Sequence, residues 1–195
     1  MKKAEVVEII EPKAIFTGEA DAPVTLMEFG DYESEECAKA NDVVKELMEK
    51  FPGKIKFIFR HFPLLKYHQK AHKAAEAAIA AGQEGKFWEM HQAIFKYRRN
   101  LGVTSLKLYA REAGVTSKKL LDELINGMYG WQVQGDLTEG KKLGVTTIPT
   151  FFINGVQFEQ SPTYKNLSTY INVLLKTKKP KSKSLAIPLV VKKSA

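Results

Sequence analysis

The order of apolar and polar residues predicts a strand, a helix and a second strand between residues 23 and 62. A short β-prone run follows Pro23 in DAPVTLMEFGDY, which favours a strand. Ser34 then precedes a segment with helical spacing of apolar residues that ends before PGK. In KIKFIFRHF, apolar and other residues alternate again. A strand, a helix and a strand within about 35 residues predict a βαβ unit with parallel strands.

The middle of the chain is helical in pattern, from His68 to about Gly130. Four segments are separated by glycine or capping residues: AHKAAEAAIAAG, KFWEMHQAIFKYRR, TSLKLYAREAG and TSKKLLDELING. Each carries apolar residues three and four positions apart, as an amphipathic helix does. A further helix is predicted near residues 131–143. We therefore expect a helical insertion after the βαβ unit.

The last part of the pattern predicts a hairpin and a helix. VTTIPTFFINGVQFEQ divides into two short strands around Asn154-Gly155, a sequence typical of a two-residue hairpin turn. SPTYKNLSTYINVLLK has helical spacing, with Ser161 or Thr163 near its start. Two sheet halves, βαβ and ββα, with helices inserted between them predict an α/β protein with a thioredoxin fold and a helical insertion domain.

Composition and charge narrow the class of protein. The 195 residues are 44% hydrophobic, enough for one core with an inserted subdomain. The formal net charge is +8, but residues 176–195 contain seven lysines and no acidic residue, so residues 1–175 carry 8 − 7, or about +1. The body of the chain therefore has no electrostatic reason to bind nucleic acid, and we expect no nucleic-acid partner.

Targeting signals and cysteine content give weaker limits. No apolar run approaches the ~18–20 residues that cross a bilayer, and the first residues contain no continuous apolar stretch of a signal peptide. We expect no membrane span and a cytoplasmic location for the chain as written, or an extracytoplasmic one if a signal peptide has been removed. The only cysteine is Cys37, which excludes an intramolecular disulfide.

Four sequence blocks together resemble a known family. DAPVTLMEFGDYE followed by a helix with a cysteine, FIFRHFPL, AHKAAEAAIAAGQEGKFWEMHQAIF and LGVTTIPTFFINGVQF are similar to the bacterial DsbA-like thiol-disulfide oxidoreductases. The resemblance covers about residues 18–175. It implies an N-terminal extension (1–17), a thioredoxin-fold domain (18–65 and 131–175), a helical lid (66–130) and a basic tail (176–195). It also implies protein or peptide thiols and disulfides as partners.

The resemblance assigns site residues, and one position departs from the family pattern. The family has a Cys-x-x-Cys pair on the first turn of the helix, facing a cis proline. Cys37 fits the second cysteine, Ser34 stands at the first, and Glu35 and Glu36 lie between them. Pro149 fits the cis proline, which would leave the backbone of Ile148 free to pair with an extended peptide. The implied site is thus Cys37 and Ser34 at the catalytic positions, with Ile148, Pro149, Glu35 and Glu36 binding substrate.

The residue types argue against dithiol catalysis. In a Cys-x-x-Cys helix the first thiol attacks and the second resolves the mixed disulfide, so Ser34 removes the attacking group. The side chain of Cys37 turns toward the sheet, and Glu35 and Glu36 repel a thiolate. We expect Cys37 to be a partly buried residue and Ser34 to cap the helix. The alternative role for Ser34 is a hydrogen bond to a glutathione thiolate, as in kappa-class glutathione transferases.

Three functions are compatible with these residues. The first is that of a DsbA-like oxidoreductase family protein whose altered single-thiol centre is weak or inactive as a dithiol catalyst. The alternatives are a module that binds peptides or proteins in the proline groove, and a glutathione-dependent transferase. We expect no cofactor. His68, His72, His91 and Cys37 lack the local spacing of a metal site, so we expect no metal and histidines that pack or cap helices. Arg60 and His61 at the end of the second strand are predicted to be a solvated pair, and the alternative is that they supply charge near the site.

Overall fold

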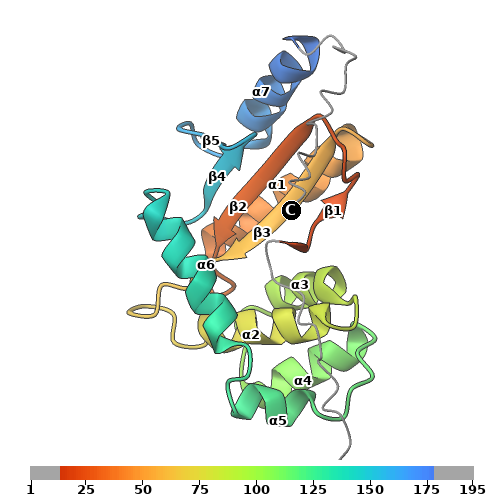
Figure 1. Cartoon of the computed structure of the whole chain (residues 1–195), viewed down its shortest axis with the longest axis vertical. Coiled ribbons are helices and arrows are strands. Elements are labelled where there is room, and N and C mark those ends of the chain that lie inside the picture. Colours follow the sequence, from red (N-terminus) through yellow and green to blue (C-terminus); the bar gives the residue numbers. More distant parts are fainter. Residues whose placement is uncertain (1–13, 178–195) are drawn as a thin grey trace, which may run out of the picture.

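The computed structural model describes residues 14–177, and the rest of the predicted extension and basic tail lies outside the described residues. One sheet runs through the molecule in the order β1-β3-β2-β4-β5 (Figure 1). Its strands are β1 (Thr17–Gly18), β2 (Val24–Gly30), β3 (Ile55–His61), β4 (Thr150–Ile153) and β5 (Val156–Gln157). The helices are α1 (Glu35–Lys50), α2 (Ala71–Gly82), α3 (Phe87–Lys96), α4 (Val103–Glu112), α5 (Leu120–Ile125), α6 (Gly130–Lys142) and α7 (Tyr164–Thr177).

The βαβ unit predicted from the sequence is confirmed. β2 and β3 are parallel over their whole length, from Val24 opposite Ile55 to Gly30 opposite His61. Helix α1 crosses behind the sheet in Figure 1 and buries a stripe that includes Val44 and Leu47. The helical spacing of those residues is what places them on one face, toward the apolar side chains of the strands.

The hairpin and the last helix are also confirmed. β4 and β5 are antiparallel and joined by Asn154 and Gly155, both with positive φ (51° and 82°), as a tight hairpin turn requires. β4 is antiparallel to β2, with Thr150 opposite Phe29. Thr163 caps α7, because its Oγ1 accepts a hydrogen bond from the N–H of Asn166 at 3.2 Å.

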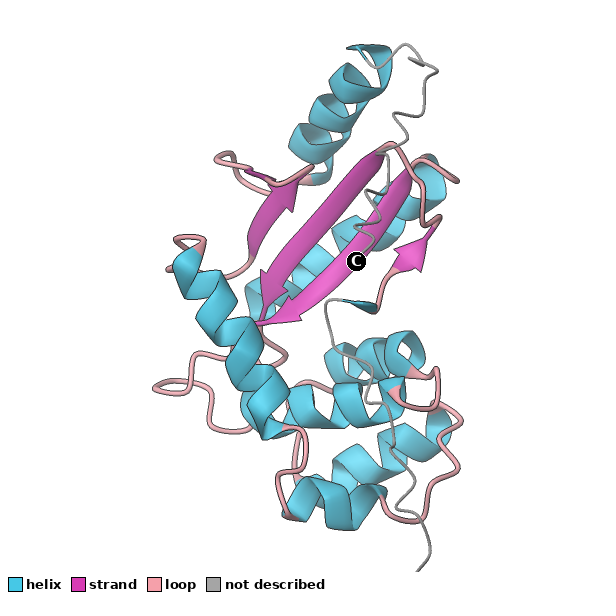
Figure 2. Ribbon diagram, viewed as in Figure 1, coloured by secondary structure: helices cyan, strands magenta, loops and turns pink. Residues whose placement is uncertain are grey.

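The helices between β3 and β4 form a group of their own beyond one end of the sheet (Figure 2). α2 packs on α3, α5 and α6, and α3 and α4 also pack together. α6 runs from this group to the end of β3. The prediction of a thioredoxin fold with a helical insertion is therefore confirmed. The short strand β1, antiparallel to β3, was not predicted, since two residues carry no periodic pattern.

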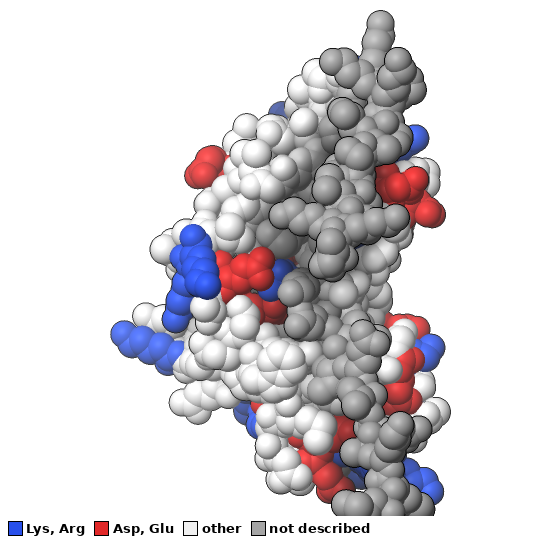
Figure 3. Space-filling model, in the orientation of Figure 1, with Lys and Arg blue, Asp and Glu red and all other residues white. Residues whose placement is uncertain are grey.

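Apolar side chains make one continuous core between the sheet, α1 and the inserted helices, with a smaller cluster around Phe29 and Phe62. Where β3 meets α3, aromatic rings gather: Phe59 and His91 lie 4.7 Å apart between ring centres. On the face drawn in Figure 3, basic and acidic side chains occur in small mixed groups.

Candidate functional site

The first turn of α1 begins at Ser34, as predicted. Ser34 has extended backbone (φ −70°, ψ 129°), and its Oγ accepts a hydrogen bond from the backbone N–H of Cys37 at 3.2 Å. This bond satisfies one of the N–H groups that the start of a helix leaves without a partner. The hydroxyl is therefore occupied in capping, and the Ser34 residue is 7% exposed.

Cys37 is more deeply buried than the partly buried residue that we expected, with 0% of its surface exposed. Its Sγ accepts a hydrogen bond from the N–H of Asp31 at 3.4 Å. Burial raises the pKa of the thiol well above its ordinary value, and the nearby carboxyl of Glu28 adds to the increase. The hydrogen bonds from Ser34 and Asp31 act in the opposite direction and are the smaller effect. The thiol is thus protonated at neutral pH and shielded from solvent.

Glu28 lies close enough to Cys37 to affect its charge, and it was missed in the sequence. The residue is 1% exposed, and its Oε1 has no hydrogen-bond partner within residues 14–177. Burial raises the pKa of this carboxyl to about 8, so it is largely protonated at neutral pH. The signal was available: in β2, Glu28 lies two residues after Leu26 and four after Val24, on the same buried face.

The Ile148-Pro149 peptide bond is cis, as the resemblance implied. Pro149 directly precedes Thr150, which lies opposite Phe29, so the proline is placed across from the end of β2 that leads into Ser34. Ile148 is half-buried, and its backbone N–H and C=O have no hydrogen-bond partner among the described residues.

Glu35 and Glu36 have exposed side chains, in contrast to the buried thiol one residue further on. Lys39 Nζ lies 3.4 Å from Glu35 Oε1 and 2.9 Å from Glu36 Oε1. Arg98, which follows α3, lies 3.5 Å from Glu35 Oε2. The two carboxylates therefore form the charged outer rim of the first turn, beside cations from α1 and from the insertion.

The loop before Ser34 is fixed to the inserted helices by two carboxylates. Asp31 Oδ2 accepts hydrogen bonds from the N–H of Leu64 and from Nδ1 of His68, both at 2.8 Å. Glu33 Oε2 accepts from the N–H groups of Lys70 and Ala71, at 2.7 and 2.8 Å, and so caps the start of α2. The position of the site loop is thus set by the insertion.

A buried polar chain links α1 to α3. Tyr32 Oη lies 3.0 Å from His91 Nδ1, and His91 Nε2 lies 3.1 Å from Asn41 Oδ1. Gln92 Nε2 also donates to Asn41 Oδ1 at 3.2 Å. Burial lowers the pKa of His91 well below its ordinary value, which keeps the ring neutral. His91 is therefore part of the packing between site helix and insertion.

The prediction that Arg60 and His61 form a solvated pair is wrong. Arg60 Nε lies 2.7 Å from Asp136 Oδ1, its Nη2 lies 2.6 Å from Glu139 Oε2, and both Arg60 and Asp136 are buried. His61 is 1% exposed, and burial lowers its pKa to about 3. Arg60 and His61 are buried because α6 covers the end of β3.

Comparisons with known proteins identify the family and the fold. A family model described as "Thioredoxin" matches residues 11–173. The chain is 34% identical over 154 residues to a Na⁺/H⁺ antiporter NhaA 1 of Salinispora arenicola. The matched region is 79% of this chain and 24% of that protein. The chain thus spans about a quarter of the length of this curated relative. None of the helices among residues 14–177 is both long and apolar enough to cross a bilayer.

Two solved structures show the same fold. Oxidised BdbD from Bacillus subtilis has a TM-score of 0.76 and 24% identity, covering 85% of this chain and 93% of that one. The thiol-disulfide exchange protein α-DsbA2 from Wolbachia pipientis has a TM-score of 0.69 and 24% identity, covering 82% and 86%. The chain therefore belongs to the thioredoxin family and has the fold of its DsbA-like members, with Ser34 and the single thiol of Cys37 on the first turn of the site helix.

Proposed function

We propose that this chain is a DsbA-like domain that binds extended segments of other proteins at the Ser34 and Pro149 site and does not catalyse dithiol exchange. The state of Cys37 carries the proposal. The only thiol of the chain is fully buried, and its pKa is raised by burial and by Glu28. Catalysis would need an exposed thiolate to attack a disulfide.

The binding part of the proposal is supported by the backbone next to Pro149. Ile148 offers an N–H and a C=O that have no partner in the described part of the chain, and residues 146 and 147 beside it are exposed. An extended segment of a partner protein can pair with such a backbone as an added strand does. The glutathione alternative has less support, because the Ser34 hydroxyl already caps α1.

A reductase assay tests the catalytic half. The chain should reduce insulin no faster than its Cys37→Ala variant in the presence of dithiothreitol, since it cannot form an internal disulfide. Ser34→Cys should change this. Oxidised glutathione would take one hydrogen from each of the two thiols and become two glutathione molecules, leaving a disulfide between the introduced cysteine and Cys37 that is visible as a mass loss of two hydrogens. Turnover of the unmodified chain above the Cys37→Ala control contradicts the proposal.

A binding measurement tests the other half. Reduced and carbamidomethylated ribonuclease A, an unfolded chain with blocked thiols, should bind the protein and its Cys37→Ala variant alike. Thr147→Trp, which places a bulky ring on an exposed position beside Ile148, should weaken binding about tenfold. Val156→Trp on the exposed strand β5 is the control and should leave binding unchanged. Equal binding by both tryptophan variants would remove the site from the proposal.

A further inference from the structure

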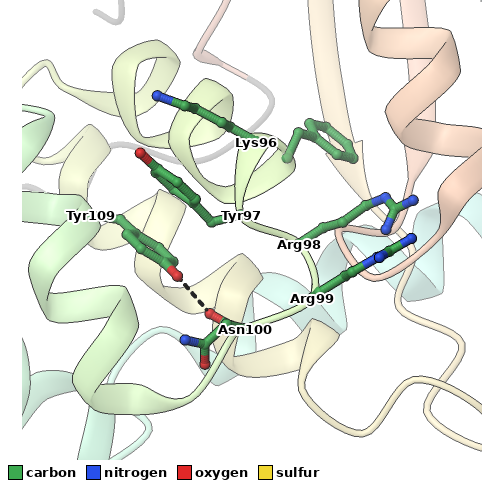
Figure 4. A pocket seen from close by; sticks show the side chains of 7 residues that line it. Lys96, Tyr97, Arg98, Arg99, Asn100 and Tyr109 are labelled. Carbon is green, nitrogen blue, oxygen red and sulfur yellow. Dashed lines mark hydrogen bonds between the residues drawn. The ribbon is translucent and has the colours of Figure 1, made fainter.

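Three basic residues lie close together in the sequence at the end of α3: Lys96, whose side chain extends toward Tyr97, and Arg98 and Arg99, which extend to the opposite side (Figure 4). With Phe95, Tyr97, Asn100 and Tyr109 they line a hollow of about 520 Å³, a size typical of ligand sites (Figure 4). No acidic residue belongs to this lining. A surface built only from cations, aromatic rings and one amide is suited to an anionic ligand.

The hollow has a rigid wall. The rings of Tyr97 and Tyr109 are stacked, with centres 4.8 Å apart and planes 20° apart. Tyr109 Oη donates a hydrogen bond to the carbonyl oxygen of Asn100 at 2.9 Å, which joins α4 to the turn that carries the arginines. The arginine backbone is therefore held in place before any ligand arrives, and binding costs less ordering entropy.

The three cations differ in how strongly they already interact with neighbouring groups of the protein. Lys96 lies in the last turn of α3, where a positive charge complements the helix dipole. Arg98 contacts Glu35 at 3.5 Å, but this carboxylate is 61% exposed, and such surface pairs contribute only about 0–1 kcal/mol. Arg99 is exposed and pairs with no acidic group within residues 14–177. The helix dipole and the Tyr97 ring, whose centre lies 4.8 Å from Lys96 Nζ, account for Lys96 and leave Arg99 unexplained.

The hollow adjoins the candidate site. Figure 4 shows Arg98 and Arg99 extending in the same direction, away from the tyrosine rings. Arg98 meets Glu35 on the first turn of α1, one residue after Ser34. A segment that reaches the site helix can thus extend into the hollow, and a carboxylate on it can replace Glu35 on Arg98 and pair with Arg99. Arginine presents paired N–H groups that match a carboxylate.

We propose that Arg98 and Arg99, at the hollow after α3, bind the acidic side chains of a protein segment that occupies the neighbouring site. This inference rests on the proposed function, since it names the class of segment that is bound. The exposed glutamates on the rim, Glu35 and Glu36, share the single positive charge of Lys39 and so attract no acidic segment. The attraction must therefore come from the arginines of the hollow.

The test uses two short fluorescein-labelled peptides, one of alternating alanine and glutamate and one of alternating alanine and glutamine, with fluorescence anisotropy as the readout. The glutamate peptide should bind more tightly, and raising the salt from about 50 to about 500 mM should weaken only that peptide. Arg98→Ala with Arg99→Ala should weaken binding of the glutamate peptide about tenfold and leave binding of the glutamine peptide unchanged.

The matched control is Lys165→Ala with Lys176→Ala, which removes two exposed charges from α7 at the other end of the molecule (Figure 1). Equal binding of the two peptides, or an equal loss in the control, overturns the inference. A single-stranded RNA that binds more tightly than the glutamate peptide and depends on Arg99 also overturns it. Unfolded ribonuclease distinguishes the two proposals. If Thr147→Trp weakens binding of the ribonuclease but the glutamate and glutamine peptides bind equally, only the acidic subsite is wrong.

Discussion

At the scale of single residues, the site is defined by a thiol and a carboxyl that are both buried and both protonated at neutral pH. Burial raises the pKa of Cys37 and of Glu28, and a charge on Glu28 would raise the pKa of the thiol further, because two anions are unfavourable in one apolar region. The site therefore holds protons on both groups and has no exposed nucleophile. Because burial disfavours the ionised form of Glu28, this residue lowers the stability of the folded protein as the pH rises.

Glu28→Gln should remove this pH dependence. The carboxyl has a pKa of about 8 in the folded chain and 4.5 as an isolated group. Between pH 4.5 and pH 8 it ionises only in the unfolded chain, so the wild-type stability falls by about 1.4 kcal/mol per pH unit, on the order of 5 kcal/mol in all. Below this window both states are protonated, and above it both are ionised.

Urea unfolding of both proteins at pH 5 and at pH 9 measures this effect. The stability gained through Glu28→Gln should be much larger at pH 9 than at pH 5, since glutamine has the same shape and no proton to lose. Titrating groups that are not coupled to Glu28, including His61, affect both proteins equally and cancel in the comparison. Parallel pH curves for the two proteins would mean that Glu28 is not buried as described.

At the scale of elements, regular periodicity made the helices and the longer strands predictable, and contacts over long sequence distances decided the rest. The burial of Glu28 could be predicted locally, because Glu28 lies two residues after Leu26 and so faces the same side of β2. The burial of Arg60 could not, because it depends on the distant residue Asp136 on α6. The site residues could be placed from the resemblance and the helix cap. The hollow at Arg98 and Arg99 could not, because it needs the stacking of α4 on the turn after α3.

The cap of α2 gives a test at this scale. Glu33→Ala removes the acceptor for the N–H groups of Lys70 and Ala71 and should lower the free energy of unfolding by about 1–2 kcal/mol. Glu46→Ala, an exposed glutamate in the interior of α1, should change it by less than about 0.5 kcal/mol. Thermal unfolding followed by circular dichroism measures both, and equal losses would show that the cap does not stabilise α2.

At the scale of the whole molecule, the sheet and the insertion are held together by a continuous apolar core and by a few polar contacts, some buried and some partly exposed. Arg60 and Asp136 join β3 to α6, Asp31 and Glu33 join the site loop to α2 and the turn before it, and His91 joins α3 to α1. The contacts of His68, Glu33 and His91 cross between the sheet and the inserted helices, and the Arg60–Asp136 contact lies where α6 returns to the sheet. The insertion is therefore a support for the site loop as well as a cover.

The Arg60–Asp136 pair tests this coupling. Arg60→Met leaves a buried carboxyl without its cation and should destabilise the protein by about 3–5 kcal/mol. In the double variant with Asp136→Asn, the amide oxygen can still accept the hydrogen bond of the His61 N–H. The double variant should be clearly more stable than Arg60→Met alone. A double-mutant cycle in urea should give a coupling of about 1–3 kcal/mol, and additive losses would contradict the described contact.

The pairing of β2 with β4 has a consequence for how the protein is made. Phe29 lies opposite Thr150, 150 − 29 = 121 residues later, with the whole insertion between them. While a ribosome is still synthesising the inserted helices, β2 can pair with β3 but has no partner on its other side. The nascent chain then presents an unpaired strand edge that ends at the loop before Ser34, and such edges attract other extended chains. This edge stays open until β4, the last partner of β2 to be synthesised, pairs with it.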